Sequence, residues 1–381
     1  MGLFEWYLVF TAIFCGLYFI LMTTYIIQWL KMPLFIPPNE GLKSNITIVI
    51  PARNEEQNIK HCLSDIRKQN FPLGKIEVIV VDDYSKDDTA TLASSLIKTY
   101  GLNGKVLKMG AINHELPFKK GAITEAIKIA SHDLIITTDA DCRMGPEWLS
   151  AFVAYYDRYT PKMIAGPIGY LKGNGLISQL QSLECAGLML ATGGGFNGQF
   201  PIMANGANLC YEKQAFQKVA GYLNNEDTAS GDDLFLLMKF KKQFKGNLHF
   251  IKSPEAMVYT QPLNSFMSFW MQRKRWASKS RQCKDLHFLI IGSIVLGANL
   301  ILLFGLPISI LVPSIFSSLF IFIFGSKLIV DFCFLFFATK FQNNKNLMVI
   351  FPIGAILNTL SVSIFGLTSW FGKYNWKGRS H

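Results

Sequence analysis

Three clusters of aspartates have the residue type and the spacing to bind a metal ion or to accept a proton. They are Asp82-Asp83, Asp139-Ala140-Asp141 and Asp232-Asp233. The first two directly follow apolar runs that read as buried strands, and the third opens an apolar segment that reads as a helix. A single aspartate at such a position is most often a turn or cap residue. Three clusters in one region, two of them at strand ends, instead predict a functional site.

The Asp-x-Asp spacing suits a hard cation. In an extended segment residues i and i+2 point to the same side, so the carboxylates of Asp139 and Asp141 can address one point. Mg²⁺ or Mn²⁺ would be held there by one or two carboxylates and by the phosphates of a substrate. A cation in this place neutralises the charge that develops on a departing diphosphate. Pro146, at the start of the next helix, would fix the pair on a loop between two rigid elements.

The third cluster could supply the base for a transfer reaction. Asp232 and Asp233 open a helix, whose N-terminus stabilises a carboxylate and thereby lowers its basicity. Proton transfer to either residue would therefore be concerted with attack by an acceptor hydroxyl. Lys120 could bind phosphate as a point charge, and a solvated lysine at a helix start would look the same in the sequence.

The elements that must position these residues alternate between strand and helix patterns. β-branched runs predict strands at 46–50, 76–81 and 134–138. Helical spacing of apolar residues predicts helices around 59–66 and 92–97, another after Lys120 and another after Pro146. This alternation predicts an α/β domain with a mostly parallel sheet that is covered on both faces. Such sheets bind ligands beyond the carboxyl ends of their strands, where the first two clusters stand.

At these positions the chain resembles glycosyltransferase family 2, the nucleotide-sugar enzymes with a GT-A fold. The resemblance runs in order from about residue 46 to residue 281. Its five motifs read Ile50-Pro51-Ala52-Arg53-Asn54-Glu55-Glu56, Val80-Val81-Asp82-Asp83-Tyr84-Ser85, Thr138-Asp139-Ala140-Asp141-Cys142, Asp232-Asp233 and Gln272-Arg273-Lys274-Arg275-Trp276. Each motif alone is weak, but five in the right order are specific as a set.

The resemblance implies a Rossmann-like GT-A domain that transfers a sugar with inversion from a UDP-sugar. Asp233 would be the catalytic base, with Asp232 beside it. Asp139 and Asp141 would hold the Mg²⁺ or Mn²⁺ ion. Implied donor contacts are Pro51, Ala52, Asn54, Glu55, Asp82, Asp83, Lys120 and Asp139. Implied contacts with the acceptor and the diphosphate are Gln272, Arg273, Arg275 and Trp276.

Two positions depart from the family pattern. Asp232 stands where a glutamate usually precedes the base, and Tyr84 stands where glycine is common in the nucleotide-binding turn. Neither departure removes a catalytic group, so the expected activity is unchanged.

Three long stretches are almost free of charge and predict membrane spans. They cover residues 6–30, 286–338 and 347–371. Each is longer than the about 20 helical residues that cross a hydrocarbon core. The predicted organisation is a transmembrane anchor at 1–32, the GT-A domain at 44–262, an amphipathic interfacial helix at 264–285, about three transmembrane helices at 286–371 and a basic tail at 372–381.

Charge and cysteine usage predict the side of the membrane that the domain occupies. Lys31 and Lys43 follow the first stretch, and the positive-inside rule then places the domain in the cytoplasm of a multi-pass plasma-membrane protein. Seven cysteines without paired spacing agree with a reducing compartment. The net charge of +11 suits an anionic membrane surface or substrate. Because the basic residues cluster beside the apolar stretches, nucleic acid is not expected as a partner.

The course of the C-terminal region stays open in the sequence. Four spans in all would leave the basic tail outside, whereas its charge favours the inside. Residues 286–338 could hold a re-entrant pair or three short segments. Lys327 and Asp331 lie one helical turn apart and could pair within the membrane boundary.

Three functions fit these patterns. A transferase could add one sugar to a membrane lipid or lipid-linked acceptor, or a processive synthase of the same family could extend a polysaccharide. We favour the lipid acceptor, because a channel for a growing polymer usually needs more helices than this chain supplies. The third function, a scaffold with a degenerate transferase domain, is disfavoured because all the expected acids are present.

Overall fold

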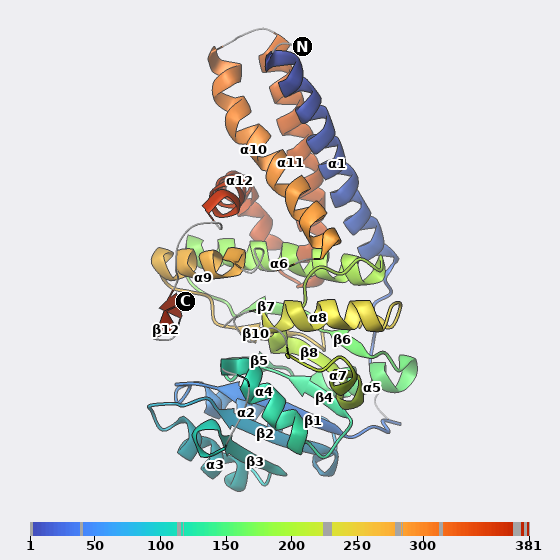
Figure 1. The fold of residues 1–381 in the computed structure, drawn as a ribbon, viewed down its shortest axis with the longest axis vertical. Coiled ribbons are helices and arrows are strands. Elements are labelled where there is room, and N and C mark those ends of the chain that lie inside the picture. Colours follow the sequence, from blue (N-terminus) through green and yellow to red (C-terminus); the bar gives the residue numbers. More distant parts are fainter. Residues whose placement is uncertain are drawn as a thin grey trace. The chain divides into compact units, whose positions relative to one another are not determined.

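The computed structural model describes residues 3–38, 41–112, 116, 118–223, 231–278, 283, 285–311, 315–368, 375–376 and 379–380. The chain forms two compact units (Figure 1). The sheet unit comprises Met32–Leu171 and Gly195–Gln261, and the helical unit comprises Met1–Lys31, Lys172–Gly194 and Pro262–His381. Each unit is described by itself below.

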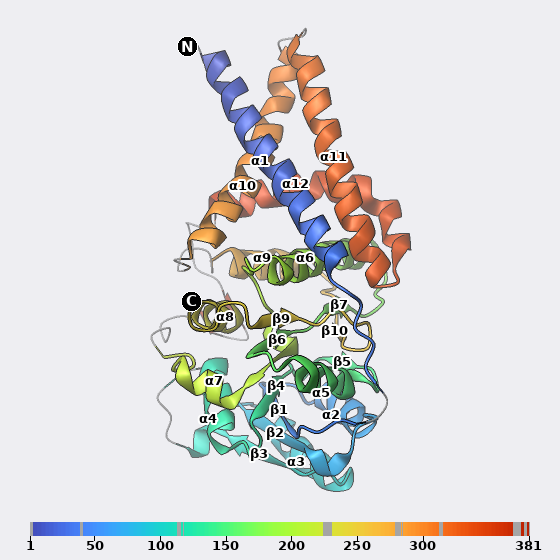
Figure 2. The same cartoon turned by 90° about the vertical axis from the view of Figure 1, so that its right-hand side faces the viewer.

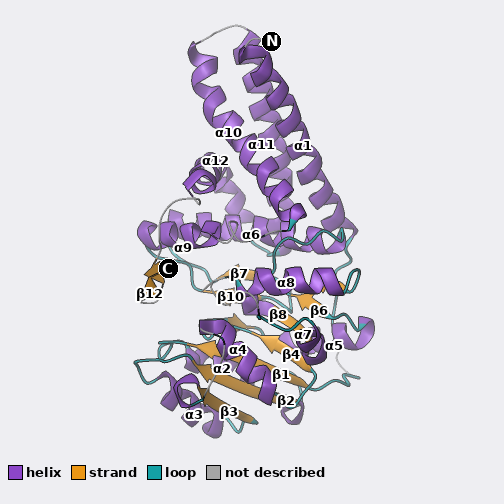
Figure 3. Ribbon diagram, in the orientation of Figure 1, coloured by secondary structure: helices purple, strands orange, loops and turns teal. Residues whose placement is uncertain are grey.

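The sheet unit is built on a seven-stranded sheet of order β3-β2-β1-β4-β8-β6-β9 (Figure 3). Its strands are β1 (Ile46–Ala52), β2 (Ile76–Asp82), β3 (Gly104–Lys108), β4 (Leu134–Thr137), β6 (Met163–Ala165), β8 (Leu209–Glu212) and β9 (Leu248–Phe250). Within this sheet β8 runs antiparallel to both of its neighbours, and the other pairs are parallel. The predicted α/β class with a mostly parallel sheet is confirmed.

A small second sheet of order β5-β10-β7 belongs to the same unit. Its strands are β5 (Arg143–Met144), β7 (Ile168–Tyr170) and β10 (Val258–Thr260). β10 pairs antiparallel with β5 and parallel with β7. Because β5 directly follows the Asp-x-Asp motif, this sheet holds one end of the loop that carries that motif.

Helices cover both faces of the main sheet. They are α2 (Ile59–Arg67), α3 (Thr89–Thr99), α4 (Phe118–Ile129), α5 (Trp148–Tyr159), α7 (Lys213–Lys218) and α8 (Asp232–Gln243), with 3₁₀ turns at Leu73–Lys75, Met109–Ala111 and Gly206–Asn208. Ile46, Ile48 and Ile50 of β1 join a buried cluster with residues of α2, α3 and α5. Side chains alternate along a strand, so Thr47 and Val49 face the other side, and α4 contacts β1 and β2 there.

The helical unit contains long helices that lie side by side (Figures 1 and 2). Its helices are α1 (Leu3–Lys31), α6 (Leu176–Asn197, of which the last three residues group with the sheet unit), α9 (Phe266–Ser278), α10 (Leu286–Leu311), α11 (Ile315–Phe341) and α12 (Phe351–Thr368), with a 3₁₀ helix at Lys345–Ile350. The short strands β11 (Asn375–Trp376) and β12 (Arg379–Ser380) pair with each other. The other residues of the predicted basic tail lie outside the described part of the chain.

Within the described part of the chain, four helical segments are long and apolar enough to cross a membrane. They are Trp6–Lys31, Leu286–Leu311, Ser317–Phe341 and Lys345–Thr368. Of the two alternatives expected for residues 286–338, the three short segments were wrong, because this stretch contains the two long helices α10 and α11. Each of these helices has enough consecutive apolar residues to span a bilayer alone, so no re-entrant turn is needed.

α6 packs closely against the long helices of its own unit. A side chain at Gly194 would meet the carbonyl oxygen of Tyr25 in α1 at 2.8 Å, and one at Gly187 would meet Leu335 of α11 at 3.0 Å. Glycine at these two positions therefore lets α6 approach both helices. The sequence-based range 44–262 runs across α6, yet residues 172–194 group with the helical unit.

Candidate active site

The carboxyl ends of β1, β2 and β4 meet at one edge of the main sheet. Ala52 at the end of β1 is in register with Asp82 at the end of β2. Thr137 at the end of β4 is in register with Val49 of β1, and the next amide, that of Thr138, donates to the Val49 carbonyl at 3.1 Å. The residues that follow these strands therefore share one edge, as the sequence predicted.

Asp82 and Asp83 form a tight turn at this edge. Both side chains are buried. The Ser85 amide donates to Asp82 Oδ1 at 3.3 Å, and the Asp83 amide donates to the Ala52 carbonyl at 2.9 Å. Arg53 donates from a terminal nitrogen to the Asp83 carbonyl at 2.9 Å and lies 4.0 Å from its carboxylate. The turn after β2 is thus held by the motif that follows β1.

The loops after β1 and β2 are linked by further hydrogen bonds. The Asn54 amide donates to Ser85 Oγ at 3.0 Å, and Asn54 Oδ1 accepts from the Lys86 amide at 2.9 Å. The Glu55 amide donates to Thr89 Oγ1 at 2.8 Å. Asn54 and Glu55, both predicted donor contacts, therefore also fix one loop against the other.

Tyr84, which stands where glycine is common in the family, has the backbone of a glycine. Its φ is +57°, in the left-handed region that costs a side-chain-bearing residue energy. Its ring packs on Gly110, where an added side chain would meet the ring at 3.4 Å. The turn therefore keeps the geometry that the family uses glycine for, with the strain offset by packing.

The Asp-x-Asp motif lies on the loop after β4. The Asp139 carboxylate is 36% exposed and accepts a hydrogen bond from Lys119 Nζ at 2.5 Å. Asp141 Oδ2 accepts from Thr260 Oγ1 at 3.2 Å. Burial, and then the charges of Asp139 and Asp141, raise the pKa of the Cys142 thiol.

Lys119 joins the Asp-x-Asp motif to the start of α8. Its Nζ lies 2.5 Å from Asp139 Oδ1 and 3.7 Å from Asp232 Oδ2. A side chain on Gly206 would lie 3.3 Å from the same Asp232 oxygen and 3.7 Å from Lys119 Nζ, so this glycine leaves space at the junction. Burial lowers the pKa of Lys119, but the charges of Asp139 and Asp232 outweigh burial and hold that pKa above its ordinary value.

The second acidic pair occupies the first turn of α8. Gly231 precedes it with φ +85°, a conformation that glycine adopts freely. Asp233 Oδ1 accepts from the Leu234 amide at 2.8 Å. Both carboxylates therefore lie at the positive end of the helix dipole.

Lys120 and Lys119 point in different directions from α4. Lys120 is 2% exposed, and its Nζ lies 5.3 Å from the ring centre of Phe235 in α8. Successive helical residues are about 100° apart, so the two lysines cannot face the same point. Sequence reasoning selected Lys120 as the phosphate contact and missed Lys119, because a single sequence does not distinguish the directions of two adjacent lysines.

The donor set of Asp139 and Asp141 fits Mg²⁺ or Mn²⁺. Within the described part of the chain no three His, Cys, Asp or Glu side chains gather as an all-protein metal cage would require. Two carboxylates on one loop are the usual protein share for a cation that also binds substrate phosphates. Lys119 Nζ lies 2.5 Å from Asp139 Oδ1, so the ammonium group and such a cation would share this carboxylate.

The predicted acceptor motif lies on α9 in the helical unit. Arg273 donates from Nε and Nη2 to Glu184 Oε2 of α6 at 3.1 and 2.5 Å, and from Nη1 to Gln272 Oε1 at 2.7 Å. Its guanidinium carbon lies 4.2 Å from the ring centre of Trp276 and 4.5 Å from that of Phe269. This buried arginine therefore ties α9 to α6, while the contacts of the motif with an acceptor or a diphosphate stay predictions.

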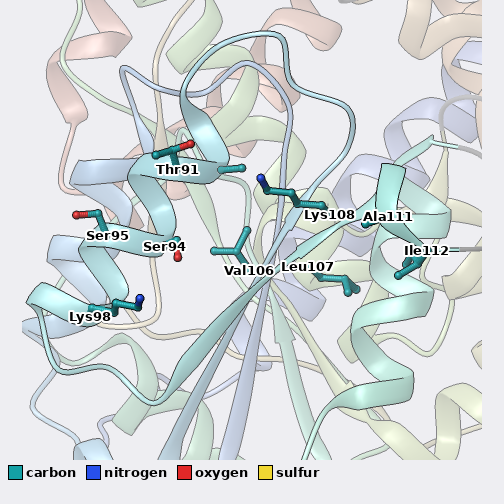
Figure 4. Close-up of a pocket in the computed structure, with 10 residues that line it drawn as sticks. Thr91, Ser94, Ser95, Lys98, Val106, Leu107, Lys108, Ala111 and Ile112 are labelled. Carbon is teal, nitrogen blue, oxygen red and sulfur yellow. The ribbon is translucent and has the colours of Figure 1, made fainter.

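A hollow of about 720 Å³ opens between α3 and the end of β3 (Figure 4). Its described lining includes hydroxyls and two lysines, Lys98 and Lys108, but no carboxylate. Lys108 is in register with Asp82 across the sheet. The hollow is thus next to the turn at Asp82 and Asp83 but is not lined by the aspartates of the candidate site.

Family models match most of this architecture. The model described as "Glycosyl transferase family 2" matches residues 47–219, and "Glycosyl transferase family group 2" matches residues 134–342, more than half of the chain. The chain belongs to glycosyltransferase family 2. The family predicted from its five motifs is therefore confirmed.

Curated relatives of this glycosyltransferase match it in part. The chain is 28% identical over 130 residues to glycosyltransferase AglE of Haloferax volcanii. This alignment covers 34% of this chain and 41% of that protein. It is 26% identical over 249 residues to the β-monoglucosyldiacylglycerol synthase of Trichormus variabilis, covering 64% of this chain and 50% of that protein. The chain thus spans about half the length of these two relatives.

A solved structure shares the fold of the glycosyltransferase. It is the mannosyltransferase PcManGT of Pyrobaculum calidifontis in complex with GDP-Man and Mn²⁺. The TM-score is 0.59 at 17% identity, and the alignment covers 92% of this chain and 97% of that one. The likeness supports the GT-A fold predicted from the sequence.

Proposed function

We propose that this glycosyltransferase moves a single sugar, with inversion, from a UDP-sugar to a membrane lipid or a lipid-linked acceptor. The observation that carries the proposal is the bridge made by Lys119, which lies between Asp139 of the metal motif and Asp232 of the predicted base pair. A donor diphosphate bound near Asp139 would thus lie close to the carboxylate pair of Asp232 and Asp233.

Asp233 is the proposed base for the acceptor hydroxyl. It holds the second position of the pair at the start of α8, where the helix N-terminus stabilises its ionised form. A carboxylate stabilised in this way is a weak base, so it takes the proton as the hydroxyl attacks the sugar. Asp232 stands beside it and shares the charge of Lys119.

Asp139 and Asp141 are the proposed ligands of Mg²⁺ or Mn²⁺. The ion, when bound, would neutralise charge on the departing diphosphate. Lys119 can take part in the same neutralisation, since an ammonium group binds phosphate as a point charge. Asp82 and Asp83, together with Pro51, Ala52, Asn54 and Glu55, remain the proposed contacts of the nucleotide.

The apolar helices and α9 support a lipid acceptor. Phe266 and Met267 at the start of α9 are 63% and 67% exposed, and Arg273 and Trp276 follow on the same helix. A helix that mixes exposed apolar side chains with basic ones suits a membrane interface. The relative from Trichormus variabilis is described as a glucosyldiacylglycerol synthase, which agrees with an acceptor of this class. Gln272, Arg275 and Trp276 are the proposed contacts of the acceptor and the diphosphate.

The proposed location is a plasma membrane crossed several times, with the sheet unit in the cytoplasm. Four candidate spans and the lysines after the first one, Lys31 and Lys43, support this orientation. Labelling of single cysteines placed in the sheet unit, in intact cells and in inverted vesicles, tests it. Labelling of that unit from outside intact cells would reverse the orientation.

Membranes containing the full chain would be incubated with a panel of labelled UDP- and GDP-sugars, with and without Mn²⁺. We expect the label from one UDP-sugar to enter the organic phase as a lipid with one added sugar. The Asp233→Asn variant is the matched control for endogenous activity. Transfer from a GDP-sugar alone would overturn the UDP assignment. A water-soluble glycan of high molecular weight would favour the processive synthase.

A further inference from the structure

One face of α2 is turned toward the loop that carries the Asp-x-Asp motif. Cys62 and Asp65 lie three residues apart and so share one side of the helix, and Gln69 directly follows its C-cap, Lys68. Cys62 Sγ lies 3.9 Å from the Asp139 carbonyl oxygen. Gln69 Nε2 donates to the Gly145 carbonyl at 2.8 Å, and its Oε1 accepts from the Leu149 amide at 3.0 Å. The loop is therefore contacted at its beginning by α2 and held at its end by the residue that follows the C-cap of this helix.

Asp65, between these two residues, holds the middle of the loop. Its side chain accepts from Arg143 Nε at 2.6 Å and from Nη2 at 3.0 Å, and from the Met144 amide at 3.2 Å. Two parallel bonds from a guanidinium to a carboxylate fix direction as well as distance. Asp65 is 7% exposed, and a carboxylate buried to this degree is retained only with such partners.

The contacts of Asp65 continue to Asp141 through two strands. Arg143 and Met144 form β5, which pairs with Tyr259 and Val258 of β10. The next residue of β10, Thr260, donates from Oγ1 to Asp141 Oδ2 at 3.2 Å. Asp65 thus fixes β5, β5 fixes the register of β10, and β10 brings a hydroxyl to the carboxylate of the metal motif.

We propose that Asp65 is a positioning residue for the divalent cation, acting through Arg143 and Met144 on the direction of Asp141. The inference rests on the proposed role of Asp141 as a metal ligand. Groups that orient metal ligands change metal affinity by roughly 10- to 100-fold when they are removed. Asp65→Asn keeps an oxygen for the Met144 amide but loses the ion pair with Arg143, so it should weaken binding of the cation within that range.

The test measures Mn²⁺ binding directly in the purified full-length protein. Free Mn²⁺ is followed by electron paramagnetic resonance, alone and with UDP, and the Mn²⁺ concentration for half-maximal donor hydrolysis is measured in parallel. Asp157→Asn is the matched control. Like Asp65, Asp157 accepts hydrogen bonds from a backbone amide and from a side chain. The Lys43 amide donates at 2.6 Å and Ser44 Oγ donates at 2.5 Å. Asp157 lies on α5, outside the Asp-x-Asp loop.

We expect Asp65→Asn to raise both Mn²⁺ constants by roughly 10- to 100-fold, with turnover recovering at saturating Mn²⁺. Asp157→Asn should leave both constants unchanged. Equal Mn²⁺ constants in the wild type and Asp65→Asn would overturn the inference and leave the metal site standing. A wild-type protein that binds no Mn²⁺ would overturn the metal site and the inference together.

A second variant keeps the test valid if Asp65→Asn does not fold. Thr260→Val removes the hydroxyl at the far end of the same chain of contacts while keeping the shape of the side chain. It should raise the Mn²⁺ constants in the same direction by a smaller factor. If Thr260→Val left the Mn²⁺ constants unchanged, this would contradict the proposal that β10 links the position of Asp65 to that of Asp141.

Discussion

The two units of this glycosyltransferase treat charged side chains in opposite ways. In the helical unit, Lys327 Nζ lies 2.5 Å from Asp331 Oδ2, and the Tyr18 hydroxyl donates to Asp331 Oδ1 at 2.7 Å. All three side chains are buried. In the sheet unit, the single ammonium group of Lys119 lies between two carboxylates, and one of them, that of Asp139, is 36% exposed.

This difference distinguishes a structural cluster from a proposed binding site. The Lys327 cluster pairs one positive charge with one negative charge and satisfies both carboxylate oxygens, as buried ions in a membrane segment require. The Lys119 cluster has more negative than positive charge and is open to solvent. A further positive charge, such as a divalent cation, would be stabilised at the Lys119 cluster. The Lys327 cluster would not stabilise it, because its one negative charge is already paired. The predictions below test this contrast, in order of their expected effect on turnover.

The largest effect is expected from removal of the cation or of its ligand. Asp141→Asn replaces an ionised oxygen by a neutral one in the Asp-x-Asp motif, and a hard cation needs the charge. Turnover should fall below detection, and excess EDTA should do the same to the wild type. Sugar transfer is measured, with circular dichroism to confirm the fold of the variant. Full activity in excess EDTA would contradict the metal assignment.

A large but measurable loss is expected at the base. Asp233→Asn should lower turnover by roughly 10²–10⁴-fold, the usual cost of a lost general base. Donor affinity should change little, because the proposed nucleotide contacts lie on the loops after β1 and β2. Turnover at saturation and binding of UDP are measured on the same preparation. A variant that no longer binds UDP but turns over normally at saturation would reverse the assignment.

The parts of the fold that follow from local pattern could be predicted from the sequence. Strands predicted at 46–50, 76–81 and 134–138 appear as β1, β2 and β4 with ends shifted by at most two residues. The antiparallel insertion of β8 between β4 and β6 was not predicted, because its partners are distant in the chain and leave no periodic signal. The grouping of α6 with the helical unit was missed for the same reason.

The candidate site shows the same division between features that local sequence pattern predicts and features that depend on contacts distant in the chain. The convergence of the strand-end aspartates follows from the parallel sheet and was predicted. The link from Asp65 to Arg143 joins residues 78 positions apart, and nothing in the spacing of either residue indicates it. Lys119 was missed because the direction in which a lysine side chain of α4 points into the fold depends on packing. Sequence therefore identified the groups that are proposed to do the chemistry, whereas the groups that orient them required coordinates.

A smaller effect is expected on α9. Trp276→Ala removes the ring on which the Arg273 guanidinium stacks, an interaction of about 0.5–2 kcal/mol, or roughly 2- to 30-fold in an equilibrium. Transfer to the acceptor should weaken by a factor in this range, while hydrolysis of the donor should change less. Both rates are measured side by side. Equal losses in the two rates would remove Trp276 from the acceptor contacts.

The smallest effect on turnover is expected from the Lys327 cluster, although its effect on stability should be large. Lys327→Met leaves the Asp331 carboxylate buried without its ion pair, and removing one partner of a buried pair destabilises by about 3–5 kcal/mol. Turnover per folded molecule should be unchanged, because the cluster is assigned no part in the reaction. The double variant Lys327→Met with Asp331→Leu should regain most of the stability, since replacing a whole buried pair by apolar residues is often close to neutral. Thermal unfolding in detergent and turnover at a temperature well below the transition are measured for both variants. If the double variant were as unstable as the single one, Lys327 and Asp331 would stabilise the protein by more than neutralising each other's charge. If Lys327→Met lowered turnover of the folded protein, the contrast between a closed cluster and an open site would fail.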